Sequence, residues 1–336
     1  MIKEALLRIV GGGHLSVKEA EGVMREIMEG RATPAQIAAY LTALRMKGET
    51  VEEITGSALV MREKAVRIRS NDPRLVDTCG TGGDQMHTFN ISTAAAFVVA
   101  GTGVRVAKHG NRSVSSTCGS ADVLKALGVS IEIPPEKVED CVNEVGIGFL
   151  FAPLFHGAMR HAVAPRQEIG IRTLFNILGP LTNPAGAAIQ VVGVYSSELA
   201  DRIAQVLMNL GSLHCFCVWG HDGLDEITIT AKTKICEAKE GKVTCYHVEP
   251  KDFGMPTGSL KDIRGGTPEQ NAGIIRDILN GQKGPKRDIV LLNAAPALVG
   301  AGKARTLQEG VLRAAESIDT GAAAEKLEAL RKATNS

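Results

Sequence analysis

Apolar residues recur with a helical period over the first 65 residues. Ile37, Tyr40, Leu41 and Leu44 share one helix face, so this segment must bury an apolar stripe. Three helix starts carry a hydroxyl followed three residues later by Glu or Gln, which is the capping-box pattern: Ser16 with Glu19, Thr33 with Gln36, and Thr50 with Glu53. Gly30 and Gly48 are expected to end two of the helices. The pattern predicts an amphipathic bundle that serves as a helical domain or a dimer face.

From residue 75 the pattern changes to short apolar runs that alternate with helical periodicity, as in βαβ units. A loop-and-helix insertion at about 152–183 interrupts this alternation, and residues 227–247 are expected to form an antiparallel hairpin around Glu240, Gly241 and Lys242. Strands are expected at 75–78, 104–107, 147–151, 189–195, 213–218 and, as a last buried strand before three C-terminal helices, 289–292. Helices are expected at 91–100, 121–127, 136–145 and 198–210.

We therefore expect an α/β protein with a small N-terminal α-helical domain and a larger α/β domain. Its central sheet should be mixed, mainly parallel, and flanked by helices. The 336 residues suit two domains, and a content of 44% hydrophobic but only 4% aromatic residues favours a core of Ala, Val, Ile and Leu.

The net charge and the lengths of the apolar runs indicate which kinds of partner the protein can bind. A formal net charge of +1 gives no global field for a polyanion, so no nucleic acid is expected and any bound anion must be held locally. The longest apolar stretch, 93–101, is far shorter than the roughly 20 residues of a membrane span. We expect no membrane partner and a cytoplasmic protein.

Seven cysteines are scattered along the chain, which is typical of a reducing compartment, and we expect free thiols. Cys215 and Cys217 should share one face of a strand. No second pair of ligands stands near them in the sequence, so they are interpreted as small core residues rather than as a metal site.

The segment 77–84 follows a predicted strand and precedes a helix that begins near Asn90. Glycines at 80, 82 and 83 allow positive φ angles and a close approach of backbone amides to a phosphate, although a tight structural turn would use the same residues. A Rossmann fingerprint requires glycine where Gln85 stands, and no Lys followed by Ser or Thr completes a P-loop. A local phosphate cradle of another kind is the remaining functional interpretation.

Further polar segments follow the predicted strands. Asn90 and Ser92 are expected to cap the next helix, and 119–122 to cap another. Residues 108–116, expected to form a loop after the strand 104–107, hold two cations, a His, an Asn and three Ser, a density that favours phosphate binding. Asp225 and Glu226 follow the strand 213–218 and can hold Mg²⁺, which takes one or two carboxylates plus substrate phosphates, or can form a charged turn.

Taken together, the segments 80–84, 90–93, 108–116 and 225–226 resemble the anthranilate phosphoribosyltransferase family. The resemblance extends over 165–173 and 176–184 and so covers nearly the whole chain. It implies an α-helical domain at 1–70, joined by an insertion at about 165–185, and an α/β domain at 71–336 that binds phosphoribosyl diphosphate. It also implies a homodimer joined through the helical domain.

The resemblance further implies the following site residues. Phosphoribosyl diphosphate would contact Gly80, Gly83, Asp84, Thr88, Asn90, Ile91, Ser92, Thr93, Lys108, His109, Gly110, Asn111, Arg112, Ser113, Val114, Ser115, Ser116 and Ser120. Anthranilate would contact Gly80, His109, Asn111 and Arg166. Mg²⁺, as two ions with substrate bound, would be held by Ser92, Asp225 and Glu226, and the catalytic residues would be Lys108, His109, Asp225 and Glu226.

On this interpretation the chain transfers a phosphoribosyl group to the amine of anthranilate in tryptophan biosynthesis. Electrostatic stabilisation of the departing diphosphate is expected to matter more than a strong base or a covalent intermediate. Two alternatives remain: a pyrimidine nucleoside phosphorylase of similar architecture, and a non-catalytic paralogue that binds nucleic acid.

Overall fold

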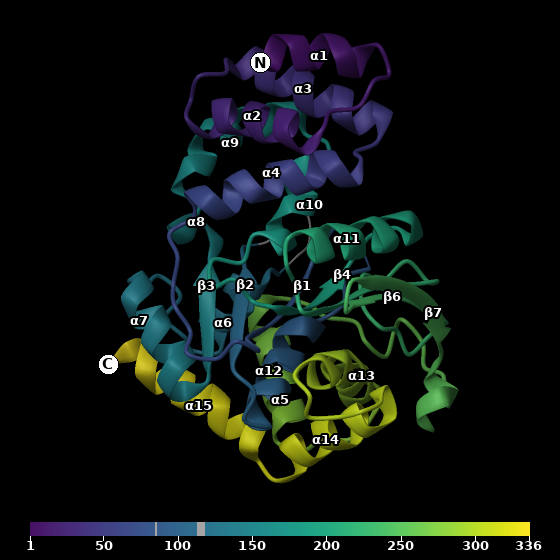
Figure 1. The fold of residues 1–336 in the computed structure, drawn as a ribbon. Helices are drawn as coiled ribbons and strands as arrows, with labels where there is room; N and C mark the ends of the chain where they lie inside the picture. The colour runs from purple at the N-terminus through teal and green to yellow at the C-terminus, as the bar shows by residue number, and fades with distance from the viewer. Residues whose placement is uncertain (85, 113–117) are drawn as a thin grey trace.

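The computed structural model describes residues 1–84, 86–112 and 118–336. Figure 1 shows a small helical layer stacked on a larger part built around a sheet. The N-terminal helices are α1 (Ile2–Val10), α2 (Val17–Met28), α3 (Pro34–Lys47) and α4 (Val51–Lys64). Within the described residues, no helix has both the length and the apolar character needed to cross a bilayer.

The expected capping boxes are confirmed at the starts of α2, α3 and α4, where Ser16, Thr33 and Thr50 each accept a hydrogen bond from the third amide of their helix. Gly48, with φ +85°, ends α3. The apolar stripe of α3 is fully buried inside the same chain, where α3 packs against α1 and α9 (Arg160–Ile169). The stripe therefore builds the core of the helical part and leaves no dimer face of its own.

One seven-stranded sheet organises the larger part, in the order β3-β2-β1-β4-β5-β6-β7. The first five strands in this order are parallel to one another. β6 pairs antiparallel with β5, and β7 pairs antiparallel with β6. This confirms the mixed, mainly parallel sheet. The strands are β1 (Val76–Gly80), β2 (Val106–Gly110), β3 (Ile147–Phe151), β4 (Ile189–Gly193), β5 (His214–Gly220), β6 (Thr233–Lys239) and β7 (Lys242–Val248).

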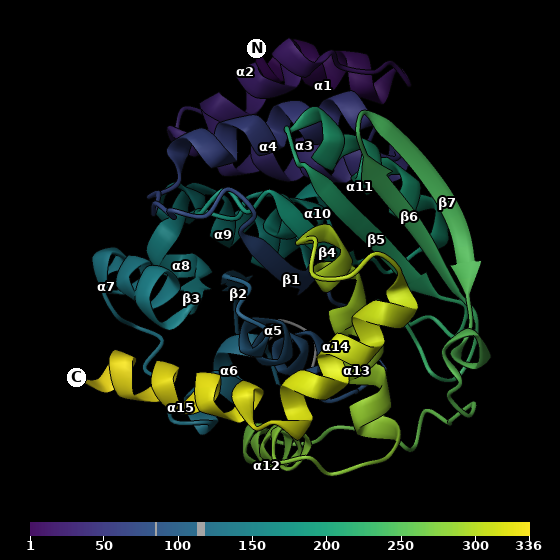
Figure 2. The ribbon, with the colours of Figure 1, turned by 60° about the horizontal axis from the view of Figure 1, so that its bottom comes forward.

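Helices cover both faces of the sheet (Figures 1 and 2). On the face toward the helical layer lie α10 (Leu174–Leu181) and α11 (Ser197–Asn209), and their apolar side chains join one core with those of α2, α3 and α4. The other face carries a second core. It is built largely from α5 (Ile91–Gly101), α6 (Ser120–Ala126), α12 (Pro268–Leu279), α13 (Pro285–Gly300), α14 (Leu307–Asp319) and α15 (Ala322–Asn335).

Shorter helices occupy the connections. They are α7 (Pro135–Asp140), which continues into the π-helix η1 (Cys141–Val145), α8 (Ala152–Phe155), and the 3-10 helices η2 (Gly157–Met159) and η3 (Pro250–Phe253). The helix expected at 136–145 is thus confirmed, with a changed hydrogen-bond pattern in its second half.

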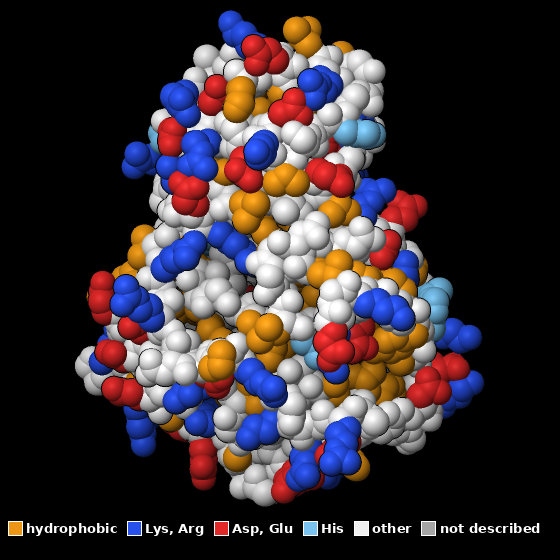
Figure 3. Space-filling view, in the orientation of Figure 1, with side chains coloured by type: hydrophobic (Ala, Val, Ile, Leu, Met, Phe, Trp, Pro, Cys, Tyr) orange, Lys and Arg blue, Asp and Glu red, His pale blue; other side chains and the backbone are white. Residues whose placement is uncertain are grey.

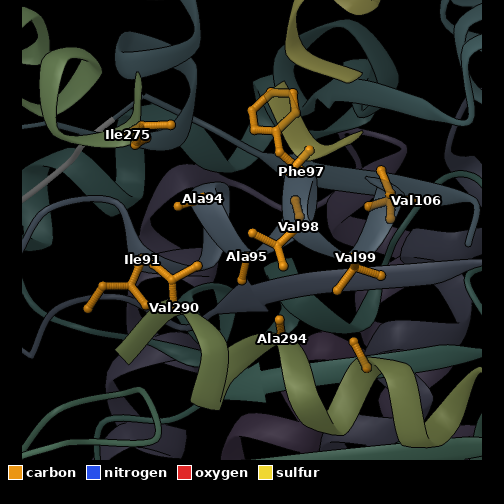
Figure 4. Close-up of a cluster of buried hydrophobic side chains, with 14 of the residues drawn as sticks. Ile91, Ala94, Ala95, Phe97, Val98, Val99, Val106, Ile275, Val290 and Ala294 are labelled. Carbon is orange, nitrogen blue, oxygen red and sulfur yellow. The ribbon is translucent and has the colours of Figure 1, made fainter. Parts of the chain in front are cut away.

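The expected strand at 289–292 is wrong, because these residues form the middle of α13. Figure 4 shows Val290 and Ala294 of α13 facing Ile91 and Ala95 of α5. Both helices are buried almost all round. A helix with no polar face shows no helical periodicity, so a short apolar run in it cannot be told from a buried strand.

The second strand begins and ends later than expected. β2 covers Val106–Gly110, so Lys108 and His109 belong to the strand and not to a loop after it. Their backbones pair with Phe149 and Leu150 of β3. Pairing on a central strand overrides the low strand propensity of these polar residues, and it fixes the direction of their side chains.

The expectation that all seven cysteines are free thiols is wrong for two of them. Cys236 and Cys245 form a disulfide, whereas Cys79, Cys118, Cys141, Cys215 and Cys217 are free. The expected hairpin is present as β6 and β7, and its register places Cys236 directly opposite Cys245. Spacing along the chain could not reveal this pairing without the register. Cys215 and Cys217 are buried in the core of one face of β5, as expected.

Candidate active site at the ends of the parallel strands

The glycine stretch after β1 packs directly against the acidic loop after β5. A Cβ added at Gly80 would lie 2.7 Å from an Asp225 carboxylate oxygen. The Gly82 amide donates a hydrogen bond to the same carboxylate over 3.0 Å. Gly82 and Gly83 have φ angles of +64° and +81°, which side chains disfavour. The glycines are thus required both by backbone conformation and by the close approach of Asp225.

Lys108 lies beneath this loop with its side chain almost fully buried. Its ammonium donates hydrogen bonds to the Thr78 carbonyl and, over 3.4 Å, to the Ser92 hydroxyl. Burial lowers the pKa of Lys108, while the nearby carboxylates of Asp77 and Glu226 act against this. One buried cation therefore links β1, the start of α5 and the acidic loop.

Two carboxyl groups crowd together next to this cation. Burial, with repulsion from Asp84, raises the pKa of Asp225 to about 7. Burial and the charge of Asp225 also raise the pKa of Glu226, which accepts a hydrogen bond from the Ser92 amide. Within the described residues, neither Asp225 nor Glu226 has an ion-pair partner within 4.0 Å. A divalent cation would relieve this crowding, so the donor set fits Mg²⁺.

A cavity of about 640 Å³ opens beside the loop. Gly83, Asp84 and Gly223 line it from the sheet, and Arg45 of α3 and Arg172 line it from the helical side. Figure 3 shows the surface hollowed between the two parts, with basic side chains at the rim. The cavity therefore lies between the helical layer and the glycine stretch.

Sequence reasoning missed Arg45, Arg172 and Tyr195 as cavity residues. The Arg172 guanidinium lies over the Tyr195 ring, 4.9 Å from its centroid. It also fills the space next to Gly83, where an added Cβ would meet it at 2.7 Å. The only sequence signal for Arg172 was its place in the 165–173 segment.

Two buried imidazoles meet on the other side of Lys108. His109 and His156 lie 5.1 Å apart between ring centroids. Nδ1 of His109 lies 3.2 Å from the Gly179 carbonyl oxygen and donates to it, and the Nε2 atoms of both rings are buried without a hydrogen-bond partner. Burial lowers the pKa of His109 to about 3 and that of His156 to about 4. Both rings are therefore neutral, and His156 was not expected from the sequence.

The prediction that the Asn90 side chain caps α5 is wrong, because no side-chain cap bond forms there. The Asn90 amide instead donates to the Cys118 carbonyl and accepts from Asn271 of α12, each over 3.0 Å. Ser92 forms no cap bond either, since its hydroxyl contacts Lys108. The cap at 119–122 is confirmed, with the Gly119 amide donating to Asp122.

The segment after β2 is only partly described. Gly110 leaves room for the Ser120 hydroxyl, which donates to the Asn111 carbonyl over 3.3 Å. Arg112 forms an ion pair with Glu132, at 2.9 Å. Ser113, Val114, Ser115 and Ser116 lie outside the described residues.

The remaining expected residues lie around this edge. Thr88 forms an isolated antiparallel bridge with Arg264, and Ile91 and Thr93 are buried in the first turn of α5. Arg166, in the last turn of α9, lies 5.1 Å from the centroid of the Phe175 ring, and burial lowers its pKa. It has no ion-pair partner within the described part of the chain.

Comparisons with known proteins agree with this architecture. Residues 72–324 match a family model described as the glycosyl transferase family, a/b domain, and residues 3–65 match its helical bundle domain. An anthranilate phosphoribosyltransferase of Moorella thermoacetica is 58% identical over 98% of this chain and 97% of its own length.

Solved structures of the same enzyme superpose closely. The enzyme from Thermus thermophilus gives a TM-score of 0.93 at 43% identity, covering 99% of both chains. The enzyme from Saccharomyces cerevisiae, in complex with phosphoribosyl diphosphate and Mg, gives 0.90 at 29% identity, covering 99% of this chain and 98% of that one. On these matches the chain belongs to the glycosyl transferase family and, within it, to the anthranilate phosphoribosyltransferases of tryptophan biosynthesis.

Proposed function

We propose that this chain performs the reaction of its family in the cleft between the helical layer and the ends of the parallel strands. In this reaction the phosphoribosyl group of phosphoribosyl diphosphate passes to the amine of anthranilate, and diphosphate leaves. The convergence of the glycine stretch, Lys108 and the Asp225–Glu226 pair at one sheet edge supports this proposal most strongly.

Phosphoribosyl diphosphate is proposed to bind along the segments that meet at this edge. Backbone amides of the glycine stretch and the start of α5 supply donors for phosphate oxygens. The full set comprises Gly80, Gly83, Asp84, Thr88, Asn90, Ile91, Ser92, Thr93, residues 108–116 and Ser120. For Arg112 to join it, the guanidinium must leave Glu132, because the two are paired in the structure.

Mg²⁺ is proposed to bind at Ser92, Asp225 and Glu226, as two ions when substrate is present. When bound, the metal supplies positive charge to the diphosphate as it departs. The raised pKa values of the two carboxyl groups favour this placement, because a cation would stabilise the charged forms that burial disfavours.

Anthranilate is proposed to bind against Gly80, His109 and Asn111, with its carboxylate paired to Arg166. A guanidinium suits this role because it offers two parallel donors to a carboxylate. The neutral His109 ring leaves a buried, unpartnered Nε2. This lone pair can accept a hydrogen bond from the amine and orient it.

The chain's own residues accelerate the reaction chiefly by positioning and charge. The aryl amine is neutral and nucleophilic near pH 7, so its attack on the sugar carbon requires orientation more than a base. Lys108 and the loop amides stabilise negative charge on the departing diphosphate. We assign Lys108, His109, Asp225 and Glu226 as the catalytic residues on this ground.

We also propose how the chain divides into domains. We divide the chain into a helical domain at 1–70 with the insertion at about 165–185, and an α/β domain at 71–336. This division is supported by the packing of α3 on α9 and of α4 on α10.

We place the protein in the cytoplasm as a homodimer joined through the helical domain, where Leu7, Val10 and Met46 are largely exposed. Sedimentation equilibrium tests the dimer: a monomer at micromolar concentration would contradict it.

The activity is tested by following anthranilate fluorescence. We expect it to fall only when phosphoribosyl diphosphate and Mg²⁺ are both present. Release of thymine from thymidine and phosphate, with anthranilate left unchanged, would instead favour a nucleoside phosphorylase.

A further inference from the structure

The outer end of the sheet, remote from the cleft in the strand order, gathers a second group of metal-binding side chains. Asp201 of α11, Cys236 of β6 and Cys245 of β7 place one ligand atom each within 4.8 Å of one another. Cys236 is buried, Asp201 is partly exposed and Cys245 is exposed, so the group is open to solvent on one side. Nothing in the proposed transferase mechanism uses these residues.

The Asp201 carboxylate lies beside the cysteine pair without bonding to the disulfide. Its carboxylate oxygen lies 3.9 Å from the Cys245 sulfur. A disulfide sulfur carries no proton and cannot donate to a carboxylate, whereas a thiol can donate and a metal can bridge the two. The Gln205 amide donates to the other oxygen over 3.2 Å and holds the side chain in place. Among the described residues, Asp201 has no ion-pair partner within 4.0 Å.

The geometry points to a zinc site in the reduced protein, formed by Asp201, Cys236 and Cys245 and closed when the two cysteines form their disulfide. Thiolate and carboxylate are ordinary Zn²⁺ ligands, with a solvent molecule able to fill the fourth position. Zn–S bonds of about 2.3 Å separate two thiolates by roughly 3.8 Å across a tetrahedral ion. Directly opposed cysteines on neighbouring strands reach this separation with a small movement.

The disulfide and dithiol states interconvert by exchange with small thiols. Two molecules of a small thiol reduce the disulfide: the S–S bond breaks, each protein sulfur gains a proton, and the two small thiols leave as their own disulfide. Zn²⁺ then binds the two sulfurs and releases both protons. A small disulfide reverses the first step and expels the metal. Disulfides in reducing compartments are commonly transient, which suits this cycle.

Bound zinc would join α11 to the β6–β7 hairpin. α11 and β6 already contact each other one helical turn before Asp201. There, Lys234 of β6 donates a hydrogen bond to the Ser197 carbonyl at the start of α11, over 2.9 Å. A metal at Asp201 would add a second connection on the same helix face, since residues four apart lie one above the other. The site is therefore formed by elements that already pack together.

Cobalt titration of the whole chain tests this proposal. The protein is reduced without oxygen and titrated with Co²⁺ in excess Mg²⁺, so that the Asp225–Glu226 pair is occupied. Sulfur-to-cobalt charge-transfer absorption reports thiolate ligands only. We expect seven reactive thiols in the reduced unfolded chain against five before reduction. One Co²⁺ per chain should then bind with this absorption, and Zn²⁺ should displace it.

Three variants separate the site from a purely structural disulfide. Cys245→Ser should abolish the absorption, Asp201→Asn should weaken Co²⁺ binding at least about tenfold, and Cys141→Ser, which alters a distant free cysteine, should change neither. Oxidation with a small disulfide should release the metal. A thiol count that stays at five, no charge-transfer absorption after reduction, or binding unchanged in Cys245→Ser or Asp201→Asn would overturn the proposal.

Discussion

The Gly82 amide donates a hydrogen bond to the Asp225 carboxylate over 3.0 Å, and this bond ties the glycine stretch after β1 to the acidic loop after β5. The two loops lie 143 residues apart in sequence. They meet because β4 stands between β1 and β5 and its last residue, Gly193, leaves space for the Asp225 backbone. The proposed phosphate and metal sites are thus mechanically coupled.

Gly80→Ala should disrupt this coupling. The new Cβ would approach an Asp225 oxygen to 2.7 Å, so the carboxylate must move away from its place beside Gly82. We expect kcat to fall on the order of 10²-fold, the range for loss of one strong electrostatic contact. Gly273→Ala is a matched control, because that helical glycine has no heavy atom near its Cβ position and should gain up to about 1 kcal/mol of stability. Equal kinetics in both variants would contradict the proposed coupling.

Glu226→Gln should lower kcat and raise the Mg²⁺ concentration needed for half-maximal activity. The substitution keeps the shape of the side chain and removes the charge that holds the metal. Activity measured across a Mg²⁺ titration checks this, with the exposed Glu240→Gln as control. An unchanged Mg²⁺ dependence would count against a metal role for Glu226.

Arg166→Ala should raise the KM for anthranilate and leave binding of phosphoribosyl diphosphate nearly intact. The guanidinium is half-buried without an ion-pair partner in the described chain, so it is available for a carboxylate. Steady-state kinetics with each substrate varied in turn provide the measurement. Equal losses for both substrates would show that the role of Arg166 is misassigned.

Each of the two buried histidines should lower the free energy of unfolding as the solution is acidified. The unfolded rings bind protons below a pH of about 6.5, whereas the folded pKa of His156 is about 4. The unfolded state therefore binds more protons between these values, and the free energy of unfolding falls as the pH drops through this window.

His156→Gln removes one of these two titrations. Between pH 7 and 5 its free energy of unfolding should fall by about 2 kcal/mol less than that of the parent chain. The buried carboxyl groups of Asp77, Asp225 and Glu226 have pKa values raised by burial and act in the opposite direction, but they are present in both proteins and cancel. Urea unfolding at the two pH values gives the comparison, and parallel pH dependences would refute the expectation.

Glu53 should be essential to the stability of the helical layer. Its fully buried carboxylate accepts hydrogen bonds from Lys47, over 2.9 Å, and from the Leu15 amide, over 3.0 Å. Glu53→Ala removes the carboxylate that pairs with the largely buried Lys47 ammonium and leaves this charge with the neutral partners His14 and the Gly48 carbonyl, so it should cost about 3–5 kcal/mol. Glu63→Ala, which breaks an exposed pair with Arg25, should cost less than about 1 kcal/mol. Chemical unfolding of the two variants distinguishes these cases.

Local patterns in the sequence predicted much of the fold. The capping boxes before α2, α3 and α4 and the turn at Glu240 depend on neighbouring residues, and both were visible in the chain. The predicted strand at 289–292 and the predicted bounds of the second strand were wrong. Burial on all sides and strand pairing are set by distant residues, which local patterns do not reveal. The Cys236–Cys245 bond required the hairpin register for the same reason.

The sequence predicted only those site residues that belong to a recognisable motif. The glycine stretch and Glu226 lie at or after the ends of their strands, Lys108 lies near the end of β2, and parallel strands bring such ends to one edge. His156, Arg172 and Arg45 come from the insertion and from α3, and no rule of sequence spacing connects them to that edge. Their roles became visible only through the stacking of the helical layer on the sheet.

The proposed function requires that a metal-bound sugar diphosphate be held between the Asp225–Glu226 pair and the glycine stretch. Anomalous diffraction from crystals grown with Mn²⁺ and phosphoribosyl diphosphate would locate both the metal and the diphosphate. We predict a Mn²⁺ peak in contact with the Glu226 carboxylate and a diphosphate oxygen. A diphosphate bound with its metal away from both carboxylates would rule out this arrangement.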